Sequence, residues 1–216
     1  MDDPSVDPVL HRAALSKLAQ LNFLAGSARP VIRELEALGG NLRVLDLATG
    51  GGDLPLRWMR HARRAGRTWQ VDGTDISPLA VEIARENCAS LPESSRPSFF
   101  PLDVLRDPLP EGYDVLTCSL FVHHLTVDDA TLLLTRMKRA AKRAVIVQDL
   151  LRSPGALRLT WLATRALSRN RLIREDGTAS VEAAFTLEEA RELARSAGFA
   201  AASVRRCWPY RWVLSE

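Results

Sequence analysis

The sequence predicts an α/β fold in which helices cover both faces of a mostly parallel sheet. Short apolar segments alternate along the chain with longer segments whose apolar residues recur at helical spacing. A glycine-rich turn, residues 50–52, directly follows the first short segment. The 216 residues, 46% of them apolar, are enough for one core of moderate size without disulfides or metals.

The elements can be placed in order along the chain. Apolar periodicity predicts helices over residues 11–23 and 28–38, the second ended by Gly39-Gly40. Buried-strand patterns then follow at residues 43–47, 69–74, 98–101, 113–119 and 144–147. Helical patterns separate them at residues 54–65, around 80–88, and after Thr126, which begins an acidic variant of the capping box. This alternation predicts parallel strands joined by right-handed crossovers.

The C-terminal part departs from this alternation. Residues 150–180 do not form a further strand and helix repeat. Thr186-Leu187-Glu188-Glu189 is a capping box, and its helix is predicted to end at Gly198. Residues 202–208 and 211–215 predict an antiparallel hairpin at the sheet edge. We therefore expect an N-terminal helical cap (1–40) and a main domain (41–216), with a helical lid insertion at about 150–185.

Composition narrows the class of protein. The net charge is only +3, and no concentrated basic stripe indicates a nucleic-acid partner. No apolar run is long enough to predict a transmembrane segment, and the acidic N-terminus predicts no secretory signal. Three widely separated cysteines, Cys88, Cys118 and Cys207, predict no metal site and no disulfide framework. These features favour a cytoplasmic location.

The turn at residues 46–53, Asp-Leu-Ala-Thr-Gly-Gly-Gly-Asp, predicts a cofactor site. Glycines allow a ligand to approach the backbone, and ligands of open α/β sheets bind at the carboxyl ends of the strands. A purely structural turn is the alternative. The sequence lacks the third glycine of the dinucleotide-binding fingerprint, because Leu54 and Pro55 follow Gly52. Neither a P-loop nor a Tyr-x-x-x-Lys sequence is present, which opposes nucleotide triphosphate binding and nicotinamide-dependent reduction.

Four motifs together resemble the class I S-adenosylmethionine-dependent methyltransferases over residues 44–149. Residues 44–52 are similar to their glycine motif, with Ala48 at the first glycine position. Asp75 ends the second predicted strand, and Asp103 follows the third. Residues 114–125 are similar to the fourth motif, including its His-His-Leu ending. Each motif alone is weak, but their order and their positions at strand ends make the resemblance specific.

The resemblance implies a Rossmann-like, doubly wound sheet of seven strands, mostly parallel, with an antiparallel last strand. It implies S-adenosyl-L-methionine as cofactor and S-adenosyl-L-homocysteine as product. The methionine part would lie against the glycine turn, the ribose against the end of the second strand, and the adenine against the end of the third. The residues implied in cofactor binding are Asp46, Ala48, Thr49, Gly50, Gly52, Asp75, Ile76, Asp103, Val104, Cys118 and Ser119.

A proton acceptor would assist transfer to a phenol, enol or amine. His123, His124 and Asp149 follow the fourth and fifth strands and are the candidates, and a histidine titrates near neutral pH. Each has a structural alternative: either histidine as a packed residue, and Asp149 as a cap for the segment after it.

The acceptor is expected to be small and apolar: aromatic, quinone-like or polyketide-like, as in the ubiquinone and menaquinone methyltransferases that the layout resembles. The fourth motif continues as Ser119-Leu120-Phe121-Val122, which favours oxygen or carbon acceptors over nucleobase amines. By analogy, Asn22, Arg152, Trp161 and Phe185 are candidate acceptor contacts. The arginine-rich stretch 152–174 is either a solvated helix face or a lid in peripheral contact with a membrane.

Other functions stay open at this point. A non-catalytic cofactor-binding or regulatory protein of the same fold is one alternative, and an RNA-directed methyltransferase is another. Either a monomer or a homodimer is compatible with the sequence.

Overall fold

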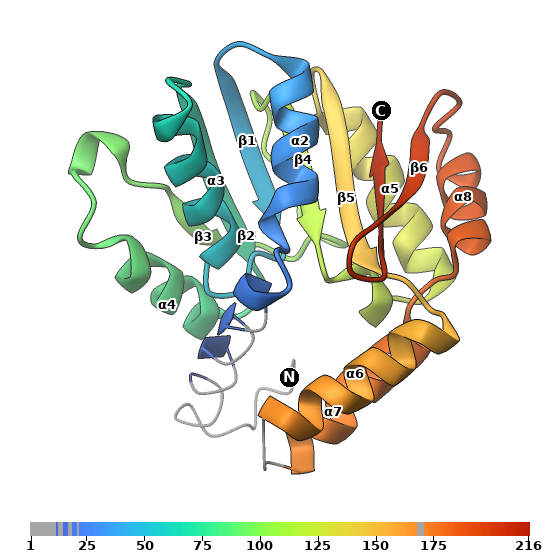
Figure 1. The fold of residues 1–216 in the computed structure, drawn as a ribbon. Helices are drawn as coiled ribbons and strands as arrows, with labels where there is room; N and C mark the ends of the chain where they lie inside the picture. The colour runs from blue at the N-terminus through green and yellow to red at the C-terminus, as the bar shows by residue number, and fades with distance from the viewer. Residues whose placement is uncertain (1–11, 13–14, 17–18, 21, 168–170) are drawn as a thin grey trace.

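The computed structural model describes residues 12, 15–16, 19–20, 22–167 and 171–216. Its centre is a seven-stranded sheet in the order β3-β2-β1-β4-β5-β7-β6 (Figure 1). The strands are β1 (Leu42–Leu47), β2 (Trp69–Asp75), β3 (Phe99–Pro101), β4 (Val115–Ser119), β5 (Ala144–Leu150), β6 (Ser203–Cys207) and β7 (Arg211–Ser215). β7 alone is antiparallel to both its neighbours, β5 and β6. The predicted mostly parallel, seven-stranded Rossmann-like sheet is therefore confirmed.

Two layers of helices cover the sheet. α2 (Ala28–Leu38) and α3 (Asp53–Arg64) pack on one face, against Val44, Val115 and Ile146. α4 (Pro78–Cys88) packs beside α3 over Phe99. α5 (Val127–Ala140) and α8 (Leu187–Ser196) cover the opposite face, against Leu45, Leu116 and Val147. Successive strand residues thus belong to different cores, as expected for a sheet buried on both sides.

The order of the strands reverses next to β1. The chain passes from β1 outward to β2 and β3, and then returns to place β4 on the other side of β1. Ligands of open α/β sheets bind outside the carboxyl ends of the strands at such a switch point. The ends of β1 and β4 are therefore the place where the fold itself favours a binding site.

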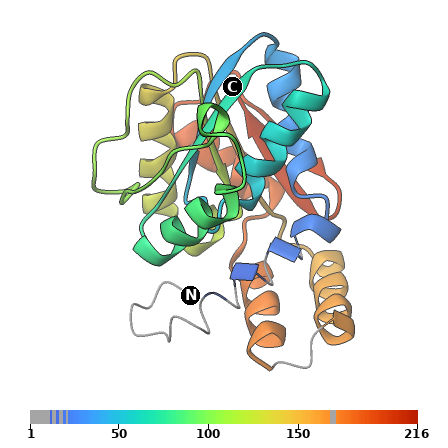
Figure 2. The same cartoon turned by 90° about the vertical axis from the view of Figure 1, so that its left-hand side faces the viewer.

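The region predicted as a lid forms two helices, α6 (Pro154–Leu167) and α7 (Arg171–Ala183). They pack against each other closely enough that a Cβ on Gly177 would lie 2.9 Å from the Cγ2 atom of Thr164. Both project beyond the carboxyl end of the sheet, away from the layered part of the molecule (Figures 1 and 2). The two short 3₁₀ helices are η1 (Glu93–Ser95) and η2 (Val122–His124).

The helix expected over residues 11–23 lies largely outside the described residues. α2, which belongs to the proposed N-terminal cap, packs directly on the sheet through Val31 and Leu35, both fully buried. Among the described parts of the chain, no helix is both long and apolar enough to span a bilayer.

Candidate active site

A cavity of about 640 Å³ opens at the carboxyl ends of β1, β2 and β4. Its walls come from the turn after β1, the ends of β2 and β4, helices α6 and α7, and the start of β7. Leu15 and Asn22 of the N-terminal segment close another side. The position agrees with the switch point of the sheet and with the sequence-based prediction of a site at residues 46–53.

The turn after β1 has a left-handed backbone conformation, which favours glycine. Gly50 and Gly52 have φ angles of 56° and 72°, and Ala48 has a φ of 53° despite its side chain. A Cβ on Gly52 would lie 2.8 Å from the Phe99 ring, so this residue must be glycine for packing. Gly52 is the N-cap of α3 and does not line the cavity, whereas Ala48, Thr49 and Gly50 do.

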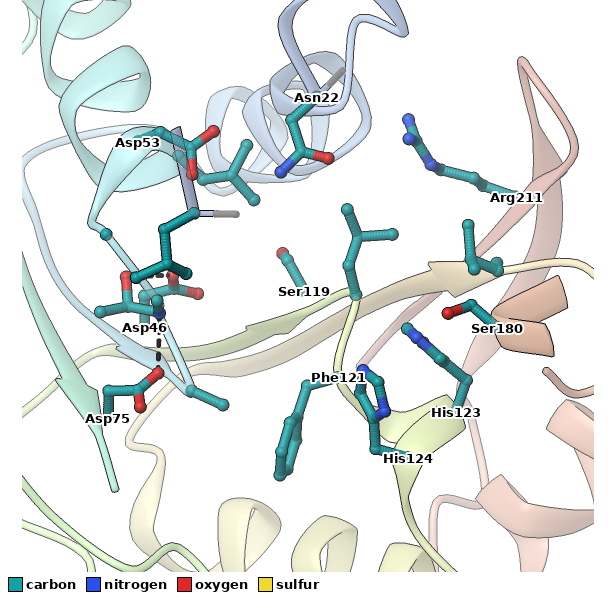
Figure 3. Close-up of a pocket in the computed structure, with 18 of the residues that line it drawn as sticks. Asn22, Asp46, Asp53, Asp75, Ser119, Phe121, His123, His124, Ser180 and Arg211 are labelled. Carbon is teal, nitrogen blue, oxygen red and sulfur yellow. Dashed lines mark hydrogen bonds between the residues drawn. The ribbon is translucent and has the colours of Figure 1, made fainter. Parts of the chain in front are cut away.

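Asp75 lies at the end of β2 with its carboxylate at the cavity wall. Its Oδ2 atom accepts a hydrogen bond from the Gly50 N–H at 2.8 Å (Figure 3). Its Oδ1 atom accepts from the Ser77 N–H at 2.9 Å. Two backbone donors from different segments fix the orientation of the carboxylate. An oriented carboxylate has further lone pairs, which can accept from a diol.

Asp46 is nearly fully buried at the end of β1 and lines the same cavity. It accepts hydrogen bonds from the hydroxyl groups of Thr49 at 2.8 Å and Thr117 at 2.7 Å. Burial raises the pKa of Asp46 to about 7, although the two hydroxyl groups oppose this shift. The group is thus poised to gain or lose a proton near neutral pH.

The turn after β3 brings Asp103 and Val104 to the cavity wall. The Asp103 Oδ1 atom accepts from the N–H groups of Leu105 and Arg106 at 2.9 and 3.3 Å. The carboxylate thus stabilises its own turn while it borders the cavity, so a structural role and a binding role are compatible here. Ile76 also lines the cavity and is 59% exposed.

Two neighbouring residues at the end of β4, Cys118 and Ser119, have different surroundings. Ser119 lines the cavity, and its hydroxyl has no hydrogen-bond partner among the described residues. Cys118 points to the other face of the sheet, where it is fully buried in the core with Leu116 and Val147. Burial raises the pKa of the Cys118 thiol well above its usual value. The structure therefore places Cys118 in the core and not in the cavity.

The three candidate proton acceptors meet at the carboxyl ends of β4 and β5. The Nδ1 atom of His123 lies 2.7 Å from Oδ1 of Asp149, and the His123 N–H donates to Oδ2 at 2.9 Å. Both histidines line the cavity, and their ring centroids are 4.1 Å apart. His123 is only 7% exposed, whereas His124 is exposed. Asp149 is fully buried behind His123 and does not line the cavity.

Of the four predicted acceptor contacts, one lines the cavity and three do not. Asn22 lines the cavity, with its amide directed into it (Figure 3). Arg152 instead forms an ion pair with Glu189 of α8. Trp161 is 48% exposed on α6 and stacks with Arg165, and Phe185 is buried in the core beside α8. These last three side chains lie outside the cavity, because helical periodicity indicates an apolar face without showing which neighbour it meets.

The cavity also includes residues that the sequence analysis did not select. Arg211 at the start of β7, Phe121 after β4 and Ser180 of α7 all line it (Figure 3). An arginine directly before the apolar run Trp212-Val213-Leu214 is the one sequence signal that could have identified Arg211.

Comparisons with known proteins show what the chain resembles. Residues 44–144 match the model of a methyltransferase domain family. A ribosomal protein L11 methyltransferase of Geobacter sulfurreducens is 46% identical over 63 residues, which cover 29% of this chain and 19% of that protein. The chain thus matches about a fifth of the length of that relative.

Solved structures extend the likeness to nearly the whole chain. The O-methyltransferase NcsB1 of neocarzinostatin biosynthesis, crystallised with S-adenosyl-L-homocysteine and 1,4-dihydroxy-2-naphthoic acid, superimposes with a TM-score of 0.70 at 20% identity. That match covers 97% of this chain and 58% of NcsB1. Magnesium protoporphyrin IX methyltransferase of Synechocystis, with S-adenosylhomocysteine bound, gives a TM-score of 0.61 at 21% identity, covering 88% of this chain and 81% of that one.

Residues 44–144 thus resemble a methyltransferase domain, and the chain has the Rossmann-like fold of methyltransferases of known structure. Several of those structures hold S-adenosylmethionine or S-adenosylhomocysteine.

Proposed function

We propose that the protein transfers the methyl group of S-adenosylmethionine to a hydroxyl oxygen of a small, largely apolar acceptor. The observation that carries this proposal is the buried His123–Asp149 pair at the wall of a cavity that also contains the glycine turn and Asp75. In this proposal, the proton acceptor and the cofactor would face the same cavity.

The residues present fit the cofactor. Asp75, fixed by Gly50 and Ser77, would accept from the ribose hydroxyl groups, and Asp103 with Val104 would border the adenine. Asp46, Thr49 and the unpartnered Ser119 hydroxyl would face the methionine part. Asp46 is suited to a neighbouring ammonium group, because a positive charge offsets the cost of its ionisation in a buried site. Bound S-adenosylmethionine supplies a methyl group already activated on a sulfonium.

His123 would accept the proton of the acceptor hydroxyl. Its Nδ1 is paired with Asp149, so we assign Nε2 as the proton-accepting atom. The carboxylate fixes the ring tautomer and stabilises the imidazolium that forms. The oxygen–methyl bond forms as the sulfur–methyl bond breaks, the electron pair of that bond stays on sulfur, and the hydroxyl proton moves to His123. Positioning of the two reactants in the cavity would supply much of the remaining rate enhancement.

The shape of the site favours a small apolar acceptor. The apolar residues Leu120, Phe121, Leu150, Leu159 and Ala163 line the cavity, the last two from α6. The molecule crystallised with NcsB1, 1,4-dihydroxy-2-naphthoic acid, is a small hydroxylated aromatic of this kind. Quinone-like and polyketide-like phenols are the acceptors we would test first. We propose that α6 and α7 act as a lid over them.

Two measurements test the proposal. Calorimetric titration with S-adenosylhomocysteine establishes cofactor binding, and incubation of S-adenosylmethionine with phenols, a ribosomal protein fraction and RNA identifies the acceptor. We expect S-adenosylhomocysteine release and a methyl ether product only with the phenols. Methylation of protein or RNA alone would contradict a small-molecule acceptor, and binding without turnover on any acceptor would favour a regulatory protein.

A further inference from the structure

Arg211 is a buried cation at the cavity wall that the proposed chemistry does not use. It begins β7, opposite Leu150 of β5, and only 5% of the residue is exposed. Its side chain extends toward Asn22 across the space above Ser119 and the two histidines (Figure 3). It therefore lies on the acceptor side of the cavity, while Asp75 lies on the opposite side.

The guanidinium has almost none of the partners it can use. Its single hydrogen bond with another described residue is from Nη1 to the Ala25 carbonyl oxygen at 3.3 Å, and Nε has none. No carboxylate of the described residues forms an ion pair with it; Cys207 and Asp149 act on it only over a longer range. Burial lowers the pKa of Arg211, in agreement with this lack of compensation. A buried cation without an acid is costly unless a ligand supplies the anion.

Arg211 is also the cation best placed to select a ligand. The other arginine at the cavity wall, Arg106, is largely exposed and pairs with Asp103 at 3.7 Å. Leu150, Leu159 and Val181 also line the cavity, and their apolar side chains have no group that could bind an anion. A guanidinium presents a planar set of N–H donors that matches a carboxylate in a bidentate arrangement.

The distance from the glycine turn favours the acceptor over the cofactor as the source of that carboxylate. β7 is separated from β1 by β4 and β5. With neighbouring strands about 4.8 Å apart, the two backbones stand roughly 14 Å from each other. The cofactor's own carboxylate would lie near the turn after β1, so a group beside His123 is the nearer match to Arg211.

We propose that the acceptor carries a carboxylate and that Arg211 binds it, which holds the hydroxyl to be methylated beside His123. The acceptor class is thus a hydroxylated, largely apolar carboxylic acid. This inference rests on the proposed function, and it adds the anionic group and the residue that recognises it.

The test compares hydroxyaryl carboxylic acids with their primary carboxamides, which have the same shape without the charge. With the wild-type protein, we expect kcat/KM to be about ten- to a hundredfold higher for the acids, as for a hydrogen-bonded charged group. Arg211→Gln should bring the acid-to-amide ratio close to one, and Arg211→Lys should restore part of it. Arg206→Gln, on the exposed side of the same hairpin, is the matched control and should keep the wild-type ratio.

Each other outcome overturns the inference. If wild-type protein binds or methylates the acids no better than the amides, the acceptor carboxylate is not recognised, while methylation of the amides would leave the proposed function intact. If Arg211→Gln lowers kcat/KM equally for the acids and the amides, the residue is structural. If it instead weakens calorimetric binding of S-adenosylhomocysteine, the carboxylate belongs to the cofactor. The wild-type comparison and Arg211→Lys still decide the matter if Arg211→Gln does not fold.

Discussion

The imidazole Nδ1 of His123 and the Oδ1 of Asp149 are 2.7 Å apart, although 26 positions of sequence separate the two residues. The pair joins the 3₁₀ turn after β4 to the end of β5. Asp149 also receives the N–H of His123, so the carboxylate fixes both the backbone and the ring. This relationship makes His123, rather than the exposed His124, the better-oriented proton acceptor.

Replacement of His123 by glutamine should lower kcat by about 10²–10⁴-fold, the usual contribution of a general base. Asp149→Asn should also lower kcat, because it removes the carboxylate that fixes the ring tautomer and stabilises the imidazolium. Steady-state kinetics with a phenolic acceptor across the pH range provides the measurement.

His61→Gln is the control for these variants, since His61 pairs with Glu36 on the surface far from the cavity. His124→Ala should also slow turnover, but less than His123→Gln. If His124→Ala proves the more damaging change, the assignment of the base to His123 is wrong.

Substitution of Asp75 by alanine should weaken S-adenosylhomocysteine binding by about a hundredfold. The change removes an acceptor of charge-assisted hydrogen bonds and leaves the N–H groups of Gly50 and Ser77 without their partner. Isothermal titration calorimetry gives the dissociation constant directly. Glu82→Gln, exposed on the helix that follows Asp75, should bind as the wild type does. An unchanged dissociation constant in Asp75→Ala would refute the ribose assignment.

The stability of the cofactor-free protein should fall as the pH rises from about 4 to about 7. Asp46 ionises near 3.8 in an unfolded chain, and its pKa is about 7 in the folded protein. The folded state therefore binds more protons between these values, and the stabilisation present at low pH is lost as pH passes the folded pKa. The expected loss is on the order of 4 kcal/mol.

Urea denaturation at several pH values between 5 and 8 tests this expectation. Asp46→Asn should remove most of the pH dependence, because an amide does not ionise. Asp128→Asn, exposed in the first turn of α5, should retain it. An equal pH dependence in wild type and Asp46→Asn would show that other groups cause the effect.

Ala48→Gly should stabilise the protein by about 0.5–1 kcal/mol. Ala48 has a φ of 53°, a conformation that costs an L-residue with a side chain roughly 1–2 kcal/mol. Glycine removes that cost, but it also raises the conformational entropy of the unfolded chain, which offsets part of the stabilisation. Denaturation midpoints measure the difference. Ala65→Gly at the end of α3, where φ is −86°, should instead destabilise the protein. A loss of stability in Ala48→Gly would indicate that the Ala48 methyl group packs favourably enough to offset the strain.

The sequence predicted most of the strands and helices because each carries its own periodicity or cap. The capping box at Thr186 is an example, since both of its hydrogen bonds are present. Predicted and observed bounds differ where strand pairing sets the end of an element. β5 continues past residue 147 to Leu150, because Leu150 pairs with Arg211 of β7. The glycine turn and Asp75 could be identified early, because their chemistry depends on residue type and on position at a strand end.

Periodicity did not determine which side chains share a cavity. Trp161 and Phe185 are aromatic residues of the kind expected to contact an acceptor. Trp161 is nevertheless half exposed, and Phe185 packs in the core. Arg211 is far from every recognised motif, and it reaches the site only because β7 inserts beside β5.

The sequence by itself determined the class of fold, the glycine turn at the cavity wall and the acids that follow the strands, since these follow from local spacing and side-chain chemistry. Only the tertiary structure decided that His123 pairs with Asp149, that Cys118 belongs to the core, and that Arg211 borders the cavity. Contacts of this second kind depend on strand order and on which face of the sheet each side chain occupies, and the interactions that fix them join residues distant in the chain.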